Sequence, residues 1–165
     1  EIYQFFEKSF LNRFLGGVDY FQDMMSAFKQ EELAIFEKKL QEILRSNVSY
    51  YDGGQEEKYY HNLVLGMILS LSKEYEIRSN LESGYGRYDI SIEPKDKRKT
   101  GFILECKVAK TEEELEEKAK EALEQIQEKK YDTEMRQRGI SKVLALGLAF
   151  CGKKVRVNYL SQKKT

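Results

Sequence analysis

One stretch, residues 85–110, constrains the fold of this 165-residue chain more than any other. It contains two strand-like runs, residues 87–93 and 101–109, separated by the polar turn Pro-Lys-Asp-Lys-Arg-Lys-Thr, which is centred on Lys97. Alternating apolar and polar residues on either side of a short turn are typical of a β-hairpin. Folding the chain antiparallel about Lys97 fixes which residue of the first strand faces which residue of the second.

This register places Asp89 directly opposite Glu105, with their Cβ atoms about 5 Å apart. Side chains alternate between the two faces of a strand, so Glu105 and Lys107 point to the same side. We expect this side of the hairpin to be polar and the opposite side to belong to the core. The alternate positions are indeed apolar: Tyr88, Ile90, Ile92, Phe102, Leu104, Cys106 and Val108.

Two carboxylates that face each other repel unless a cation joins them. Carboxylate oxygens suit Mg²⁺, which usually takes one or two carboxylates and keeps several water molecules. Lys107 would lie just beyond such a metal, where an ammonium group can orient a water molecule or neutralise a phosphate. The pattern therefore predicts phosphodiester hydrolysis at Asp89, Glu105 and Lys107. The alternative is a solvated polar face of a charged hairpin, in which Lys107 only neutralises its neighbours.

Composition limits the other functions open to the chain. Apolar residues make up 41% of it, enough for one core, and 28 basic residues balance 28 acidic ones, so no global field favours a nucleic-acid partner. Such a partner would meet local basic patches, of which the obvious ones are the hairpin turn from Lys95 to Lys99 and the pairs Lys153-Lys154 and Lys163-Lys164. Cys106 and Cys151 lie in apolar runs and are expected to be buried reduced thiols, which suggests a cytoplasmic protein. With no signal peptide and no apolar span of 18 residues, we expect no membrane association.

The Gly-rich segment at residues 52–54 is the best candidate for a domain boundary. Residues 1–52 show apolar stripes at helical spacing and are predicted to be a helical lead-in, either a small bundle or the end of a preceding domain. Residues 55–165 are predicted to form an α/β domain in the order helix, three strands, helix, strand, strand. The apolar run at 143–151 suits a strand buried on both faces, with a parallel neighbour. Helices would thus flank a mixed sheet.

Polar residues on the predicted helices are further candidates, each with a simpler explanation. Glu57 lies in the first turn of the helix expected at 55–75, where a carboxylate complements the helix dipole. His61 is the one histidine of the chain. It cannot form a site with other histidines, and is more often a hydrogen-bonded packing residue. Gln125 lies beside the apolar stripe of the helix expected at 111–129, where a surface glutamine is the default.

This order of elements, with an aspartate on the second strand and Glu-x-Lys on the third, resembles the PD-(D/E)xK nuclease superfamily, which has the restriction-endonuclease-like fold. It is most similar to the branch that forms the C-terminal domain of bacterial and archaeal proteins with an N-terminal predicted AAA-type ATPase. The matching segments are Glu57-Lys-Tyr-Tyr-His61 with Leu65-Gly66, residues 79–89, Ile103-Leu-Glu-Cys-Lys107, and Ala122-Leu-Glu-Gln-Ile126 with Tyr131. The chain departs from the pattern at Tyr88, which stands where the proline of the PD motif would precede Asp89.

By this resemblance, the metal ligands would be the carboxylates of Asp89 and Glu105 and the backbone carbonyl of Cys106. Lys107 would position the attacking water. Weaker candidates for contact with the metal or the substrate, or for accessory roles, are Glu82, Arg87, His61, Lys95 and Lys97.

The resemblance also gives roles to two helix residues, Glu57 as a carboxylate that assists the metal and Gln125 as a polar group near the catalytic strand. It implies a Mg²⁺- or Mn²⁺-dependent phosphodiesterase that acts on DNA, with an N-terminal AAA-type ATPase domain as partner in a longer chain. The alternative is a catalytically silent, nuclease-like module that docks a partner ATPase domain or binds nucleic acid without cutting it.

Overall fold

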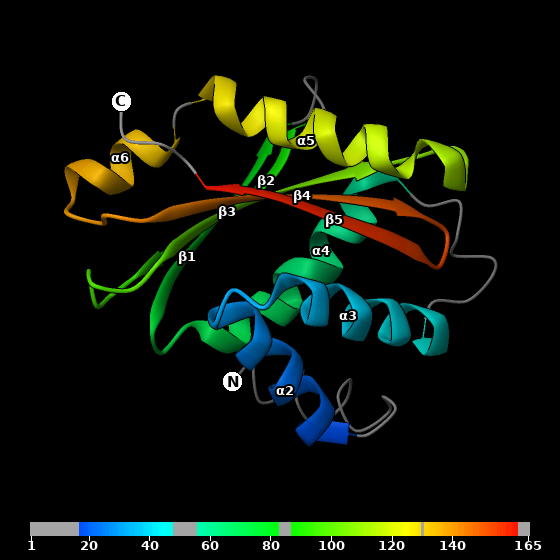
Figure 1. The fold of residues 1–165 in the computed structure, drawn as a ribbon, viewed down its shortest axis with the longest axis horizontal. Coiled ribbons are helices and arrows are strands. Elements are labelled where there is room, and N and C mark those ends of the chain that lie inside the picture. Colours follow the sequence, from blue (N-terminus) through cyan, green and yellow to red (C-terminus); the bar gives the residue numbers. More distant parts are fainter. Residues whose placement is uncertain (1–16, 48–55, 83–86, 130, 162–165) are drawn as a thin grey trace.

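The computed structural model describes residues 17–47, 56–82, 87–129 and 131–161. Their elements (Figure 1) are α2 (Gly17–Lys29), α3 (Leu33–Asn47), α4 (Glu57–Ile68), η3 (Leu69–Leu71), β1 (Tyr75–Glu82), β2 (Arg87–Pro94), β3 (Gly101–Val108), η4 (Glu112–Glu114), α5 (Leu115–Lys129), α6 (Tyr131–Gln137), β4 (Val143–Cys151) and β5 (Lys154–Ser161). This is the predicted α/β order, with α6 added. No helix in the described part of the chain is long and apolar enough to cross a membrane.

The five strands form one mixed sheet in the order β1-β2-β3-β4-β5. Strands β1, β2 and β3 pair antiparallel, β3 and β4 pair parallel, and β4 and β5 pair antiparallel. Parallel neighbours need a long crossover connection, and α5 provides most of it. Residues 143–150 of β4 are buried, which confirms the prediction of a strand covered on both faces.

The β2–β3 hairpin has the register that was predicted from its turn. Asp89 pairs with Glu105, and Ile92 pairs with Phe102. The agreement follows from the two-residue period of a strand, since a one-residue slip would move every apolar side chain of the hairpin out of the core.

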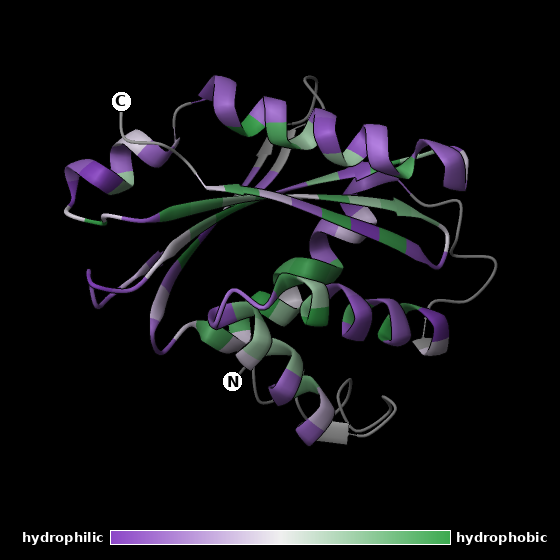
Figure 2. Ribbon diagram, viewed as in Figure 1, coloured by the Kyte–Doolittle hydropathy of each residue, from purple (hydrophilic) through white to green (hydrophobic). Residues whose placement is uncertain are grey.

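Helices α2, α3 and α4 cover one face of the sheet (Figure 1), and hydrophobic residues gather where these helices meet the strands (Figure 2). Aromatic rings join the layers. The ring centroid of Phe28 lies 4.5 Å from that of Phe102, and Tyr60 stacks on Phe150 at 4.4 Å. The described lead-in, residues 17–47, thus shares a core with the sheet. The division of the chain at residues 52–54 stays a prediction.

Helices α5 and α6 cover the other face of the sheet (Figure 1). Helix α5 comes closest at Gly147 of β4, where an added Cβ atom would lie 2.2 Å from the carbonyl oxygen of Ala119 and 3.0 Å from the Cβ atom of Ala122. Gly147 is also the β4 partner of Glu105. The absence of a side chain at Gly147 therefore allows α5 to pack closely on β4, next to Glu105 of β3.

Two local predictions were wrong. The helix expected over residues 55–75 ends at Ile68 and closes with one tight turn, η3, because the chain must reverse before Tyr75 starts β1 with its ring in the core. Helix α6 was not predicted. Its seven residues bury one apolar side chain, that of Met135, which is too few to produce a periodic stripe.

Candidate active site

The polar side of the β2–β3 hairpin is buried beneath α5. The relative exposure is 1% for Asp89, 0% for Glu105 and 8% for Lys107. Leu104 and Cys106 alternate with these residues and belong to the core on the α2–α4 side, so the acidic residues face α5. This burial rules out the solvated polar face that the sequence left open. Charged groups are rarely buried unless partners or a bound ion compensate for their lost hydration.

Three side chains donate hydrogen bonds to the carboxylate of Asp89. The ammonium of Lys129 lies 2.6 Å from its Oδ2 atom, and the hydroxyl of Tyr131 lies 3.3 Å from the same oxygen. The side-chain amide of Asn80 donates to Oδ1 at 3.0 Å. Burial, and then the charge of Asp89, raise the pKa of Tyr131. Its phenol therefore stays protonated and keeps its role as a donor.

Sequence reasoning missed Asn80 and Lys129 as members of this site. Asn80 is the β1 partner of Asp89. The Ser-Gly-Tyr-Gly run after β1 could have predicted that register, as the β2–β3 turn did. Lys129 follows Gln125 by four residues, so both lie on one side of α5. Helical spacing could thus have suggested Lys129 once Gln125 was a candidate.

Glu57, at the first position of α4, reaches the end of β3. Its carboxylate accepts a hydrogen bond from the backbone N–H of Val108, the residue after Lys107, at 3.4 Å. Burial raises the pKa of the Cys106 thiol well above its usual value, and the charges of Glu105 and Glu57 add to this effect. The structure therefore places Glu57 close enough to β3 for its charge to act on the same thiol as that of Glu105. Cys106 is buried as predicted, whereas Cys151, near the end of β4, is only partly buried.

Gln125 lies on the part of α5 that covers the site. Ala122, one turn before it, touches Gly147, and Lys129, one turn after it, binds Asp89. The Oε1 atom of Gln125 is buried and has no hydrogen-bond partner. A buried carbonyl oxygen without a donor costs about 1–3 kcal/mol. This oxygen is therefore positioned to accept a hydrogen bond from a bound ligand or a water molecule.

His61 lies on the other face of the sheet. Its Nε2 atom is 2.8 Å from the hydroxyl of Ser79, whose β2 partner is the core residue Ile90. His61 is fully buried there. The structure thus gives it the packing role that the sequence favoured and does not bring it to Asp89.

The other accessory candidates lie along the hairpin or outside the described side chains. Lys95 and Lys97 belong to the β2–β3 turn, six and eight residues from Asp89, and six residues span about 20 Å along an extended strand. The ammonium of Lys95 donates to the carbonyl of Ser72, and Lys97 is exposed. Glu82 and Arg87 pair in the backbone two positions beyond Asp89, while their side chains lie outside the described structure.

A metal ion would have to rely on the facing carboxylates. The described residues contain no group of three or more His, Cys, Asp or Glu side chains that could hold a metal. Asp89 and Glu105 nevertheless supply oxygen ligands of the kind that Mg²⁺ and Mn²⁺ prefer, and Mg²⁺ commonly binds one or two carboxylates with water completing its shell. Asp89 already binds a cationic group, the ammonium of Lys129. The donor set fits a hard divalent cation.

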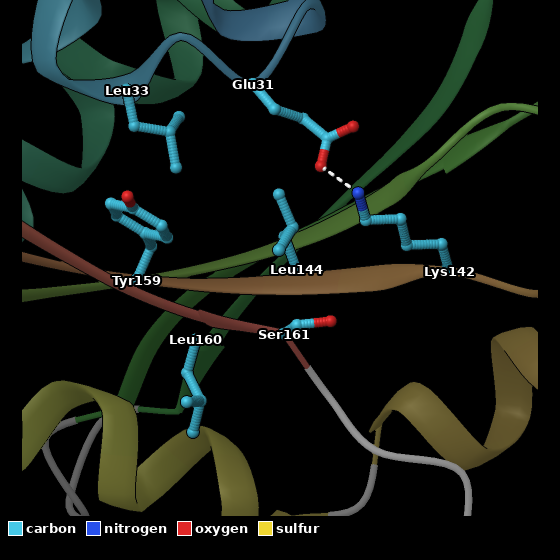
Figure 3. Close-up of a pocket in the computed structure, with 7 residues that line it drawn as sticks. All are labelled: Glu31, Leu33, Lys142, Leu144, Tyr159, Leu160 and Ser161. Atoms are coloured by element: carbon cyan, nitrogen blue, oxygen red, sulfur yellow. Dashed lines mark ion pairs between the residues drawn. The ribbon is translucent and has the colours of Figure 1, made fainter.

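A pocket of about 410 Å³ lies away from these residues. Figure 3 shows its lining side chains, which come from the segment around Glu31 and Leu33, from Lys142 and β4, and from the end of β5. Glu31 and Lys142 form an ion pair of 2.6 Å at its rim. The pocket contains none of the predicted site residues, so it does not compete with the carboxylate pair as the candidate active site.

The mixed sheet flanked by helices defines the class of the domain as α/β, of the restriction-endonuclease-like type. A comparison with protein-family models matches residues 55–159, which are 105 of the 165 residues, to the PD-(D/E)XK nuclease superfamily. The chain therefore belongs to this superfamily, as its resemblance predicted. Nucleases of the superfamily generally use divalent metals. No significant match was found among curated proteins or among solved structures.

Proposed function

We propose that this chain is a Mg²⁺- or Mn²⁺-dependent phosphodiesterase that hydrolyses DNA. The observation that carries the proposal is the buried pair of Asp89 and Glu105, with Lys107 two residues further along the same face. Burying two facing carboxylates beneath a helix is unfavourable unless cations compensate for their charge. A site that must bind a divalent cation gives this arrangement a reason, and membership of a nuclease superfamily supports it.

Asp89, Glu105 and the carbonyl of Cys106 are proposed to hold the metal. When bound, the metal would supply a Lewis acid for the phosphate. Lys107 is proposed to orient the attacking water and to stabilise negative charge that develops on the phosphate. Lys107 as a residue is 8% exposed, and a fixed charge acts more strongly in a water-poor site than in solvent.

Glu57 and Gln125 are proposed to support these groups. Glu57 holds the backbone after Lys107 through its hydrogen bond from Val108, and so fixes the end of the strand that carries the ammonium. Gln125 offers its unpartnered Oε1 atom to a water molecule near the carboxylates. Replacing Gln125 with Leu should thus lower the rate of cleavage more than it lowers stability, because no protein hydrogen bond to Oε1 is lost.

We propose the remaining context from the resemblance. The domain would act in the cytoplasm and would be joined, in a longer chain, to an N-terminal AAA-type ATPase domain. Residues 1–52 would be a helical lead-in, either a small bundle or the end of the preceding domain, and residues 55–165 the nuclease domain. Because the net charge is balanced, the chain has no global positive field, and recognition of DNA would have to depend on local contacts.

One observation favours the second candidate function, a silent module that docks an ATPase domain or binds nucleic acid without cutting it. Lys129 already neutralises Asp89 at 2.6 Å, so this carboxylate does not need a metal to be accommodated in the fold. The two candidates differ in a direct way. A silent module would neither bind Mn²⁺ at Asp89 nor cut DNA.

The test is cleavage of supercoiled plasmid and of single-stranded and duplex oligonucleotides, with Mg²⁺ or Mn²⁺ against EDTA. The wild type should cut in the presence of metal, and Asp89→Asn, which preserves shape and removes the charge, should lose the activity. Cutting that persists in EDTA or in Asp89→Asn would reject the proposed site. A folded wild type that neither cuts nor binds Mn²⁺ would favour the silent module.

A further inference from the structure

Lys129 is built into the candidate site as the cation of Asp89. Its ammonium lies 2.6 Å from Oδ2, and the two side chains are 7% and 1% exposed. The ion pair therefore lies out of bulk water, where its two charges attract strongly and where loss of one partner leaves the other uncompensated. The contact joins the end of α5 to Asp89 on β2, 40 residues away in sequence.

Both oxygens of Asp89 already accept hydrogen bonds, which leaves little room for a second cation on Oδ2. Oδ2 accepts from both Lys129 and Tyr131, and Oδ1 accepts from Asn80. A divalent ion bound to a carboxylate oxygen lies about 2.0–2.1 Å from it. An ammonium on that oxygen would then face a doubly charged ion at close range. The two cations would repel each other, so they would not share Oδ2.

Lys129 is also placed so that it can leave without unfolding the helix. It is the last residue of α5, and four rotatable bonds separate its ammonium from the backbone. The ring of Tyr131 lies 5.4 Å from the same ammonium, a distance at which a cation is attracted to an aromatic face. A side-chain rotation can therefore move the charge from the carboxylate while keeping a favourable contact.

We propose that Lys129 and the divalent metal compete for Asp89, so that the protein exchanges an internal cation for an external one when it loads its metal. The inference rests on the proposed function, because it takes Asp89 to be a metal ligand. In the metal-free protein, Lys129 stabilises the buried carboxylate. Metal can bind only when this ion pair is broken. The apparent metal affinity is therefore the intrinsic affinity multiplied by the fraction of metal-free molecules in which Lys129 has left Asp89. If that fraction is a tenth, the affinity is lowered about tenfold.

The experiment is a calorimetric titration with Mn²⁺ of the wild type and of Lys129→Met, whose unbranched side chain is one atom shorter and carries no charge. Lys120→Met, at an exposed position of the same helix, is the matched control. Lys129→Met should bind Mn²⁺ about tenfold more tightly or better, and the control should bind as the wild type does. In thermal unfolding, Lys129→Met should melt at a lower temperature than the wild type without metal, and Mn²⁺ should raise its midpoint by the larger amount.

Asp89→Asn separates the two ways in which the inference could fail. If Asp89→Asn loses Mn²⁺ binding and Lys129→Met binds no more tightly than the wild type, competition is wrong and the proposed metal site stands. If Asp89→Asn binds Mn²⁺ as the wild type does, or if no variant binds it, the inference fails together with the metal site. Should Lys129→Met not fold, Lys129→Arg keeps a cation that can form two hydrogen bonds to the carboxylate. Tighter Mn²⁺ binding by Lys129→Arg would overturn the competition.

Discussion

Replacement of Gly147 with Ala tests how closely α5 must approach β4. The added methyl group would lie 2.2 Å from the carbonyl oxygen of Ala119 and 3.0 Å from the Cβ atom of Ala122, whereas ordinary contacts begin at 3.4 Å. The first of these atoms belongs to the backbone of a helix and cannot rotate away. The helix would therefore have to move outward by about 1.2 Å, the difference between 3.4 Å and 2.2 Å.

Such a shift weakens every contact between α5 and the sheet. A radial gap of about 0.5–1 Å already loses a quarter to a half of a van der Waals contact. Overpacking of this kind costs about 1–3 kcal/mol, and we place Gly147→Ala at the upper end because backbone must move. The better strand propensity of alanine returns about 0.5–1 kcal/mol. The expected net loss is about 2 kcal/mol, or a fall in the unfolding temperature of about 4–8 °C for a chain of this size.

Chemical and thermal denaturation, followed by circular dichroism, would measure this loss, with Gly101→Ala as control. A Cβ atom at Gly101 would lie 2.7 Å from the sulfur of Met135, a flexible side-chain atom, and its other contacts would be 3.5 Å. This variant should lose less than about 1 kcal/mol, because methionine can adapt. Equal stability of the two variants, or a Gly147→Ala protein as stable as the wild type, would refute the close approach of α5 to β4.

Two further predictions concern ionisable side chains to which the proposed mechanism gives no role, the two thiols and the carboxylate of Glu74. Cys106 should not react with a thiol reagent at pH 8 in the folded chain, because its thiol is buried and burial raises its pKa. The partly buried Cys151 should react slowly. Rapid reaction of both thiols in the native protein would contradict this prediction. Lys29 and Lys99 lower the pKa of Glu74 below its usual value of 4.5, so their contribution to stability should be present above pH 4.5 and lost as the pH falls below it. Because Glu74 is exposed, this pH-dependent stabilisation should be small, should be reduced by salt and should be absent in Glu74→Gln. A loss of stability at low pH that persists in Glu74→Gln and does not respond to salt would be evidence against it.

The hairpin could be predicted because its information is local. The centre of the turn and the alternation of side chains along a strand are enough to pair Asp89 with Glu105. The same alternation places the apolar residues on the opposite face. The buried strand β4 could be predicted for a similar reason, since its apolar run is continuous. Each of these features depends on residues close together in the sequence.

The cation of Asp89 could not be predicted in this way. Its position depends on where α5 lies on the sheet, and that in turn depends on Gly147, which the sequence presents only as a small residue in an apolar strand. Lys129 is one of three lysines on a charged helix, and nothing distinguishes it from the others until this placement is known. His61 shows the converse: its rarity drew attention to it, but α4 carries it to the face of the sheet opposite Asp89.

The most direct test of the central claim is the rate of DNA cleavage by Lys107→Ala at a saturating concentration of Mn²⁺, with exposed Lys120→Ala as control. We expect Lys107→Ala to remain folded, to bind Mn²⁺ still and to cleave at least about 100-fold more slowly, which is the scale of removing one fixed charge-stabilising group from an active site. The control should cut as the wild type does. Cleavage by a folded Lys107→Ala at the wild-type rate would show that Lys107, on the same face of β3 as Glu105, has no part in the chemistry.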